Sequence, residues 1–295
     1  MQALWMVLAS LFFATMGVCV KMASTTFNAF ELVFYRGLVS MVFMAVVVQA
    51  RGSSLRSPVP AMHAWRSVVG VASLLAWFYA IGYLPLATAM TLNYMSSVWV
   101  AAFLIGGALL YARGTAQPGQ GWLMLTVMAG FAGVVMILRP ALDQDQLFAG
   151  VVGLISGLLA AMAYLQVTAL GRAGEPEERT VFYFALASAI GGGLGMLFTG
   201  LSNWQWDGAV WLLPIGVLAS LGQWCMTRAY SQGATLVVAS LQYSGIVFAS
   251  LYSLLLFGDD IPLIGWLGMA VVVSSGILAT VLRARALPNP PAEEH

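Results

Sequence analysis

The sequence predicts an all-α integral membrane protein with ten transmembrane helices. Of its 295 residues, 61% are hydrophobic and only 8% are charged, whereas about 25% are charged in an ordinary soluble domain. Apolar stretches of about 20 residues recur along the chain, which is the length that an α-helix needs to cross a bilayer. The ten-residue alternation typical of membrane β-strands is absent.

Polar residues, glycines and prolines separate the apolar stretches and set the expected helix bounds. The ten predicted spans are 3–22, 30–50, 66–84, 86–111, 121–138, 149–170, 180–199, 209–230, 234–257 and 264–282. No basic segment precedes the first span, so it is predicted to be a transmembrane helix and not a cleaved signal peptide. Several connections are only a few residues long, so neighbouring helices are expected to be antiparallel and packed together.

The distribution of arginine predicts that both termini face the cytoplasm, because cytoplasmic loops carry an excess of basic residues. With the N-terminus inside, the cytoplasmic loops and tail hold Arg51, Arg56, Arg66, Arg113, Arg172, Arg179, Arg283 and Arg285. The opposite loops hold Arg139 together with five aspartates.

Several classes of site are excluded by what the chain lacks. Cys19 and Cys225 lie in apolar runs and are interpreted as packing residues, not as a disulfide or metal pair. His63 is assigned to a polar loop and His295 is the last residue, so neither a metal site nor a catalytic residue is predicted. No Walker-type or other phosphate-binding motif is present, and no basic cluster suggests nucleic acid. No cofactor is expected.

An internal repeat divides the chain into two halves. Residues 72–88 align with residues 219–235 with seven of 17 positions identical, among them Trp77 with Trp224 and Tyr83 with Tyr230. The predicted halves are 1–140 and 141–285, followed by a cytoplasmic tail at 286–295. Each half holds five helices, and because five is odd, the second half enters the membrane from the opposite side. Inverted repeats of this kind are typical of transporters that work by alternating access, with the substrate between the halves.

The chain resembles the drug/metabolite transporter superfamily, in particular its EamA-type ten-helix exporters. The resemblance rests on the two five-helix repeats, on Arg36 early in the second span, and on the small-residue connections "LPLATA" and "SQGATL". Within that family, the tryptophan- and tyrosine-rich interior is most similar to the YddG-type amino-acid exporters of bacterial inner membranes, which implies that this chain lies in a bacterial inner membrane. The resemblance implies export of amino acids, including aromatic and hydrophobic ones, or of related small metabolites.

Polar and aromatic residues inside the spans are the candidates for the substrate site, because polar side chains in a membrane tend to face protein or water. An amino-acid cavity needs polar groups for the ammonium and the carboxylate, and an aromatic wall for varied side chains. The candidates are Arg36, Trp77, Tyr79, Asn93, Tyr94, Ser97, Tyr164, Gln166, Gln223, Trp224, Gln242 and Tyr243.

The sequence leaves alternatives open at several points. The polar candidates could instead hydrogen-bond neighbouring helices, and Arg36 either bonds such a neighbour or meets a substrate carboxylate. Lys21 and Glu31 are close enough in sequence to form an interfacial pair. Drug-like cations or other metabolites are the alternative cargo, with proton antiport as the alternative to gradient-driven export. The lipid bilayer is a certain partner, and a homodimer is as compatible with the sequence as a monomer.

Overall fold

The computed structural model describes residues 4–100, 102–103, 122, 125–126, 128–130, 132–133, 136, 144–233, 238–239 and 241–286. Its elements, in chain order, are α1 (Leu4–Ala23), α2 (Ala29–Ala50), α3 (Pro60–Tyr83), α4 (Leu86–Tyr94), α7 (Gln144–Arg172), α8 (Glu177–Thr199), α9 (Trp206–Ala209), α10 (Leu212–Gln232), α12 (Ser244–Tyr252), the π-helical turn η1 (Ser253–Phe257) and α13 (Leu263–Ala286).

The prediction of an all-α membrane protein is confirmed. The described residues form helices and connections without a strand, and six of the helical segments are long and apolar enough to cross a bilayer. The predicted spans 86–111 and 121–138 lie largely outside the described residues, and so does the start of the span 234–257. The count of ten helices therefore stays a prediction.

Local sequence explains where the helices begin and end. Asn28 caps α2 in a capping box with Glu31, which satisfies the free amides of the first turn. Pro60 stands at the first position of α3, where the missing amide costs nothing. After α8 the chain turns at Gly200 with φ of +75°, a conformation that glycine adopts without steric cost.

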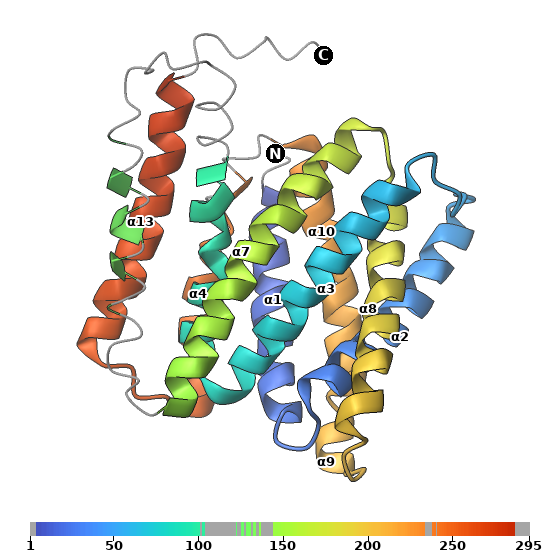
Figure 1. Cartoon of the computed structure of the whole chain (residues 1–295), viewed down its shortest axis with the longest axis horizontal. Helices are drawn as coiled ribbons and strands as arrows, with labels where there is room; N and C mark the ends of the chain where they lie inside the picture. Colours follow the sequence, from blue (N-terminus) through green and yellow to red (C-terminus); the bar gives the residue numbers. More distant parts are fainter. Residues whose placement is uncertain are drawn as a thin grey trace.

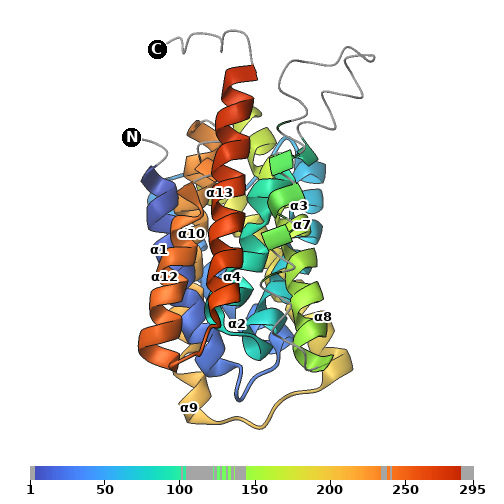
Figure 2. The ribbon, with the colours of Figure 1, turned by 90° about the vertical axis from the view of Figure 1, so that its left-hand side faces the viewer.

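The helices form a single bundle (Figures 1 and 2). Helix α1 packs against α10 and α12, and α3 packs against α7. The pair α2 and α8 lies to one side of this group, while α13 stands on the opposite side next to α4 (Figure 1). The start of α1 and the end of α13 lie at the same end of the bundle (Figure 2).

Glycines bring α2 and α8 into backbone contact. A Cβ added at Gly192 would lie 2.7 Å from the carbonyl oxygen of Phe30 and 2.8 Å from the Cα of Phe34. One added at Gly37 would collide with the backbone of Ala189 in the same way. Small residues allow this close approach in membranes, where helix association depends on packing. The glycine run 191–193 therefore serves tight packing at its central residue.

Candidate functional site

A small cavity lies between α1, α3, α4, α7, α8 and α10. Its walls are aromatic and apolar, with a few polar groups, which is the composition of a small-molecule site. The residues that line it are Phe13, Arg66, Gly70, Ser73, Leu74, Trp77, Asn93, Tyr94, Ala160, Ala163, Tyr164, Phe184 and Gln223.

Arg66 supplies the positive charge of the cavity. Its side chain is buried, and its guanidinium carbon lies 3.9 Å from the ring centroid of Phe184, within the range of a cation–π contact. Nη2 donates a hydrogen bond to Oε1 of Gln223 over 3.3 Å. Among the described residues, Nε and Nη1 have no hydrogen-bond partner. Arg66 is thus a buried cation with free donors in a cavity.

Gly70 makes room for this guanidinium. One helical turn beyond Arg66, it lies on the same face of α3. A Cβ added there would collide with Nη1 of Arg66 and lie 2.9 Å from the ring of Phe184. Gly70 and Phe184 together form a pocket for the Arg66 side chain.

Five of the twelve residues predicted from the sequence line the cavity. They are Trp77, Asn93, Tyr94, Tyr164 and Gln223. The indole of Trp77 packs edge-to-face on Phe13, with 6.4 Å between ring centroids. Nδ2 of Asn93 donates to Oγ of Ser156 over 3.0 Å, which ties α4 to α7 and fixes the amide at the cavity wall.

Three more are buried but do not line the cavity. Nε2 of Gln242 donates to the hydroxyl of Tyr164 over 3.4 Å, so it orients a cavity residue without lining the cavity itself. The Ser97 hydroxyl donates to the carbonyl of Ala239 over 2.8 Å and holds two segments together. Tyr243 is buried in the same core. These contacts match the alternative in which polar groups bond neighbouring helices.

The remaining predicted residues do not line the cavity. Tyr79 packs on Tyr83 and Phe148, and Gln166 is half-buried on α7 outside the lining. The ring of Trp224 lies 4.9 Å from the guanidinium of Arg51 near the end of α2. Arg36 is buried and donates from Nη1 to the hydroxyl of Ser188 over 3.3 Å, so it does bond a neighbouring helix.

The assignment of Arg66 and His63 to a cytoplasmic loop is wrong. Both lie inside α3, which begins at Pro60, six residues before the predicted span, and both are buried. A charged residue at the edge of an apolar run was taken for the end of the span. Pro60 at a first helical position and the spacing of Arg66 and Gly70 are the signals that point to the observed helix.

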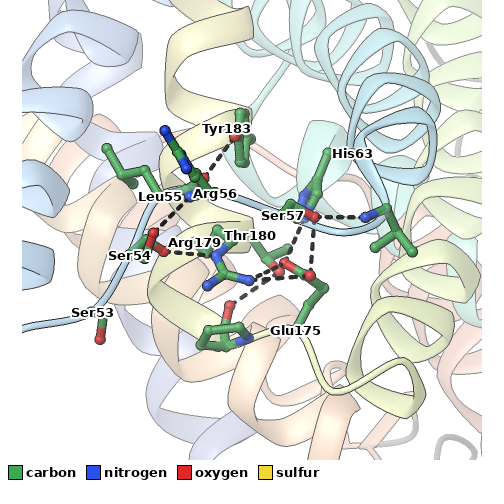
Figure 3. A network of polar contacts seen from close by, with 12 residues as sticks. Ser53, Ser54, Leu55, Arg56, Ser57, His63, Glu175, Arg179, Thr180 and Tyr183 are labelled. Atoms are coloured by element: carbon green, nitrogen blue, oxygen red, sulfur yellow. Dashed lines mark hydrogen bonds and ion pairs between the residues drawn. The ribbon is translucent and has the colours of Figure 1, made fainter.

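A network of polar contacts closes one end of the bundle (Figure 3). Nε2 of His63 lies 2.9 Å from Oε2 of Glu175 in the connection between α7 and α8. Arg179 and Ser57 donate to the same carboxylate over 3.1 and 3.0 Å. The hydroxyl of Tyr183 donates to the carbonyl of Leu55. The network joins the connection between α2 and α3 to the start of α8.

The opposite end has its own ion pair. Nζ of Lys21 lies 3.7 Å from Oδ2 of Asp259 and donates to the carbonyl of Leu84 over 2.9 Å. Glu31 instead accepts from the amide of Ser202 over 2.8 Å. The suggested pair of Lys21 with Glu31 is therefore wrong, because each residue is bound to a connection from elsewhere in the chain.

The carboxylate of Glu175 gives the first network a defined pH dependence. Burial alone would raise its pKa, but hydrogen bonds from His63, Arg179 and Ser57 outweigh burial and lower the pKa from its ordinary value of 4.5. A carboxyl whose pKa is lowered in the folded state stabilises the fold above its ordinary pKa and loses that contribution as the pH falls through the lowered value.

We expect Glu175→Gln to lower the free energy of unfolding by about 2 kcal/mol at pH 7, because charged hydrogen bonds are lost. Thermal melts in detergent at pH 7 and at decreasing pH measure the effect. The difference in Tm between wild type and variant should shrink as the pH falls below 4.5. A difference that is constant down to strongly acidic pH would show that the carboxylate charge does not stabilise this end.

No group of three potential metal ligands occurs in the part of the chain that the structure describes. Cys19 and Cys225 are both buried with free thiols, as packing residues are.

Comparisons with known proteins identify relatives over nearly the whole chain. A model of the EamA-like transporter family matches residues 1–139. The pseudopaline exporter of Pseudomonas aeruginosa is 31% identical over 282 residues, which cover 93% of this chain and 92% of that protein. The riboflavin transporter of Vibrio cholerae is 27% identical, covering 92% of this chain and 90% of that protein.

A more distant relative is the S-adenosylmethionine uptake transporter of Rickettsia bellii, which is 20% identical and covers 86% of this chain and 84% of that protein. A solved crystal structure that is 17% identical superposes with a TM-score of 0.69 over 97% of this chain and 99% of that one. This last similarity concerns the fold alone. The named relatives carry cargoes of different chemistry.

Proposed function

This chain belongs to the EamA-like transporter family, and we propose that it exports amino acids, aromatic and hydrophobic ones among them, across a bacterial inner membrane. As a family member it is a multi-pass membrane transporter of small metabolites and not an enzyme. The relative at 31% identity is an exporter, and export is the direction that we propose here.

The observation that carries the proposal is the buried guanidinium of Arg66 in the cavity. A buried charge without a partner is costly, and a carboxylate would satisfy both its charge and its free donors. Nε and Nη1 have no hydrogen-bond partner among the described residues, so each can donate to a carboxylate oxygen in a charge-assisted hydrogen bond. The cavity therefore suits a cargo with a carboxylate end.

The remaining wall suits the other parts of an amino acid. Trp77, Tyr94 and Tyr164 offer aromatic surface to an apolar or aromatic side chain. An ammonium group is attracted to the face of such rings. Asn93 and Gln223 add polar groups next to the aromatic wall, which matches the proposed role of all five residues in binding.

Contacts between helices support the two inverted halves, 1–140 and 141–285, that alternating access requires. An offset of about 147 residues relates α1 to α7 and α3 to α10. The pairs α1 with α10 and α7 with α3 should then be equivalent, and both pairs pack closely. Ser10 donates to the carbonyl of Gln242, and its counterpart Ser156 accepts from Asn93. The tail beyond residue 286 lies outside the described residues.

The proposed orientation places both termini in the cytoplasm. The start of α1 and the end of α13 lie at one end of the bundle (Figure 2). With Arg66 removed from the count made on the sequence, seven arginines are still predicted on the side of the termini and one on the opposite side, which favours a cytoplasmic location for the termini. The network around Glu175 would then close the cytoplasmic end.

Drug-like cations are the less favoured cargo. The described residues that line the cavity carry the cation of Arg66 and no acidic side chain, so a cationic cargo would be repelled. The same lack of a carboxylate favours export driven by the cargo gradient over proton antiport, since a proton carrier inside the membrane is usually acidic.

Counterflow with purified protein in liposomes tests the proposal. We expect vesicles preloaded with unlabelled phenylalanine to accumulate labelled phenylalanine, with and without an imposed pH gradient. A matched amine that lacks the carboxylate, phenethylamine, should not exchange. Exchange of phenethylamine but of no amino acid would contradict the proposal and favour cationic cargo, and exchange that depends on the pH gradient would indicate proton antiport.

A further inference from the structure

Two buried arginines share one aromatic ring in the middle of the bundle. The guanidinium carbon of Arg66 lies 3.9 Å from the ring centroid of Phe184, and that of Arg36 lies 5.0 Å from the same centroid. Arg36 also bonds Ser188, the central residue of α8. The side chains of Arg36 and Arg66 are 1% and 3% exposed. Two positive charges thus lie close together, far from solvent.

Neither cation has an acidic partner in the part of the chain that the structure describes. The ion pairs among the described residues join other groups, all near helix ends: Lys21 with Asp259, Arg51 with Glu178, and Glu175 with His63 and Arg179. Within the same described part, Nε of Arg36 has no hydrogen-bond partner, and neither do Nε and Nη1 of Arg66.

Physical chemistry disfavours this arrangement unless an anion binds. A charge taken out of water is costly unless it is paired, and two like charges in a medium of low dielectric repel each other. Buried ionisable residues in membrane proteins usually pair or serve the transported substrate. A cargo with one carboxylate would neutralise Arg66 and leave Arg36 unpaired.

Glycines beside both arginines leave space for their side chains or fix their positions. Gly70 leaves the space that the Arg66 guanidinium occupies. Gly37, next to Arg36, packs directly on the backbone of α8, which fixes the position of Arg36 relative to Phe184 and Ser188. Phe184 lines the cavity, so a group bound beside its ring can reach both arginines.

We propose that the cargo class is amino-acid derivatives with two carboxylates. One carboxylate binds Arg66 in the cavity, and the second binds Arg36 beside the ring of Phe184. This inference rests on the proposed function, since it uses the same cavity and the same role for Arg66, and it narrows the cargo from amino acids in general to those with a second acidic group.

The test compares phenylalanine with N-(carboxymethyl)phenylalanine, which has the same ring and one more carboxylate. Each labelled compound is assayed by counterflow in proteoliposomes, and half-saturation is measured for both. We expect wild type to prefer the dicarboxylate about tenfold, the change that about 1.4 kcal/mol produces. In Arg36→Gln the ratio of the two half-saturation concentrations should fall to about one. Arg36→Lys keeps the positive charge and should keep part of the preference for the dicarboxylate.

Arg228→Gln is the matched control, because Arg228 also lies against an aromatic ring, 5.2 Å from the centroid of Trp5, but outside the cavity. This variant should keep the tenfold ratio. Equal half-saturation for the two compounds in wild type, or an unchanged ratio in Arg36→Gln, would overturn the inference while the proposed function stands. Transport of neither compound would overturn both, whereas transport of the dicarboxylate alone would support the inference and restrict the proposed function.

Discussion

Replacing Arg66 by glutamine is expected to lower amino-acid counterflow at least about 100-fold, because losing one partner of a buried charge pair costs about 3 kcal/mol or more. Arg66→Lys should retain a small part of the flux, since lysine keeps the charge but cannot form two parallel hydrogen bonds to a carboxylate. The measurement is initial counterflow of labelled phenylalanine at equal protein density, and Arg228→Gln should stay close to wild type.

The thermal stability of Arg66→Gln distinguishes a role of Arg66 in binding cargo from a structural role. Without cargo, Arg66 is a buried charge with no acidic partner among the described residues. Its neutralisation should therefore leave Tm unchanged or raise it. Normal flux together with a lower Tm for Arg66→Gln would contradict the account, because the arginine would then stabilise the bundle and not bind cargo.

Adding one methyl group at Gly192 is expected to lower the free energy of unfolding by about 2–3 kcal/mol, the cost of overpacking a tight contact. The new Cβ would meet the backbone of Phe30 and Phe34 in α2, so relief requires α2 and α8 to separate. At this chain length the change corresponds to a fall in Tm of about 3–5 °C, measured by thermal melts in detergent.

Gly193→Ala is the matched control in the same glycine run. Its added Cβ would lie 3.4 Å from the side chain of Phe34, an ordinary contact, so its Tm should differ from wild type by no more than about 2 °C. Equal effects of the two substitutions would show that the contact between α2 and α8 is not as close as the structure has it.

The long helices could be predicted because hydropathy and length decide them. The spans 3–22, 30–50 and 180–199 agree with α1, α2 and α8 to within three residues at either end. The start of α3 could not be predicted in the same way. Pro60 and His63 lower the hydropathy of residues 60–65, and the partner of His63 is Glu175, more than a hundred residues later.

The types of residue in the candidate site could be predicted from the sequence, but not which of them face the cavity. Residue type identified Trp77, Asn93 and Tyr94 as lining residues, because polar and aromatic groups in a membrane face protein. The rotation of each helix about its axis decides which polar residue faces the cavity, and tertiary packing sets that rotation. For this reason Tyr79, two residues from Trp77, packs on Phe148 instead.

Arg66 was missed because a lone charge beside an apolar run is usually at the membrane surface. Its burial becomes visible only when Gly70, Phe184 and Gln223, from three different helices, surround its guanidinium. The central binding residue of the proposed site was therefore the one that charge patterning assigned to a loop.

A structure of the protein with a bound amino acid would show whether Arg66 binds the cargo. We predict that the cargo carboxylate lies within hydrogen-bond distance, about 3 Å, of Nη1 or Nε of Arg66, with its side chain against Trp77 and Tyr164. A carboxylate bound elsewhere, with Arg66 still bonded only to Gln223, would contradict the account.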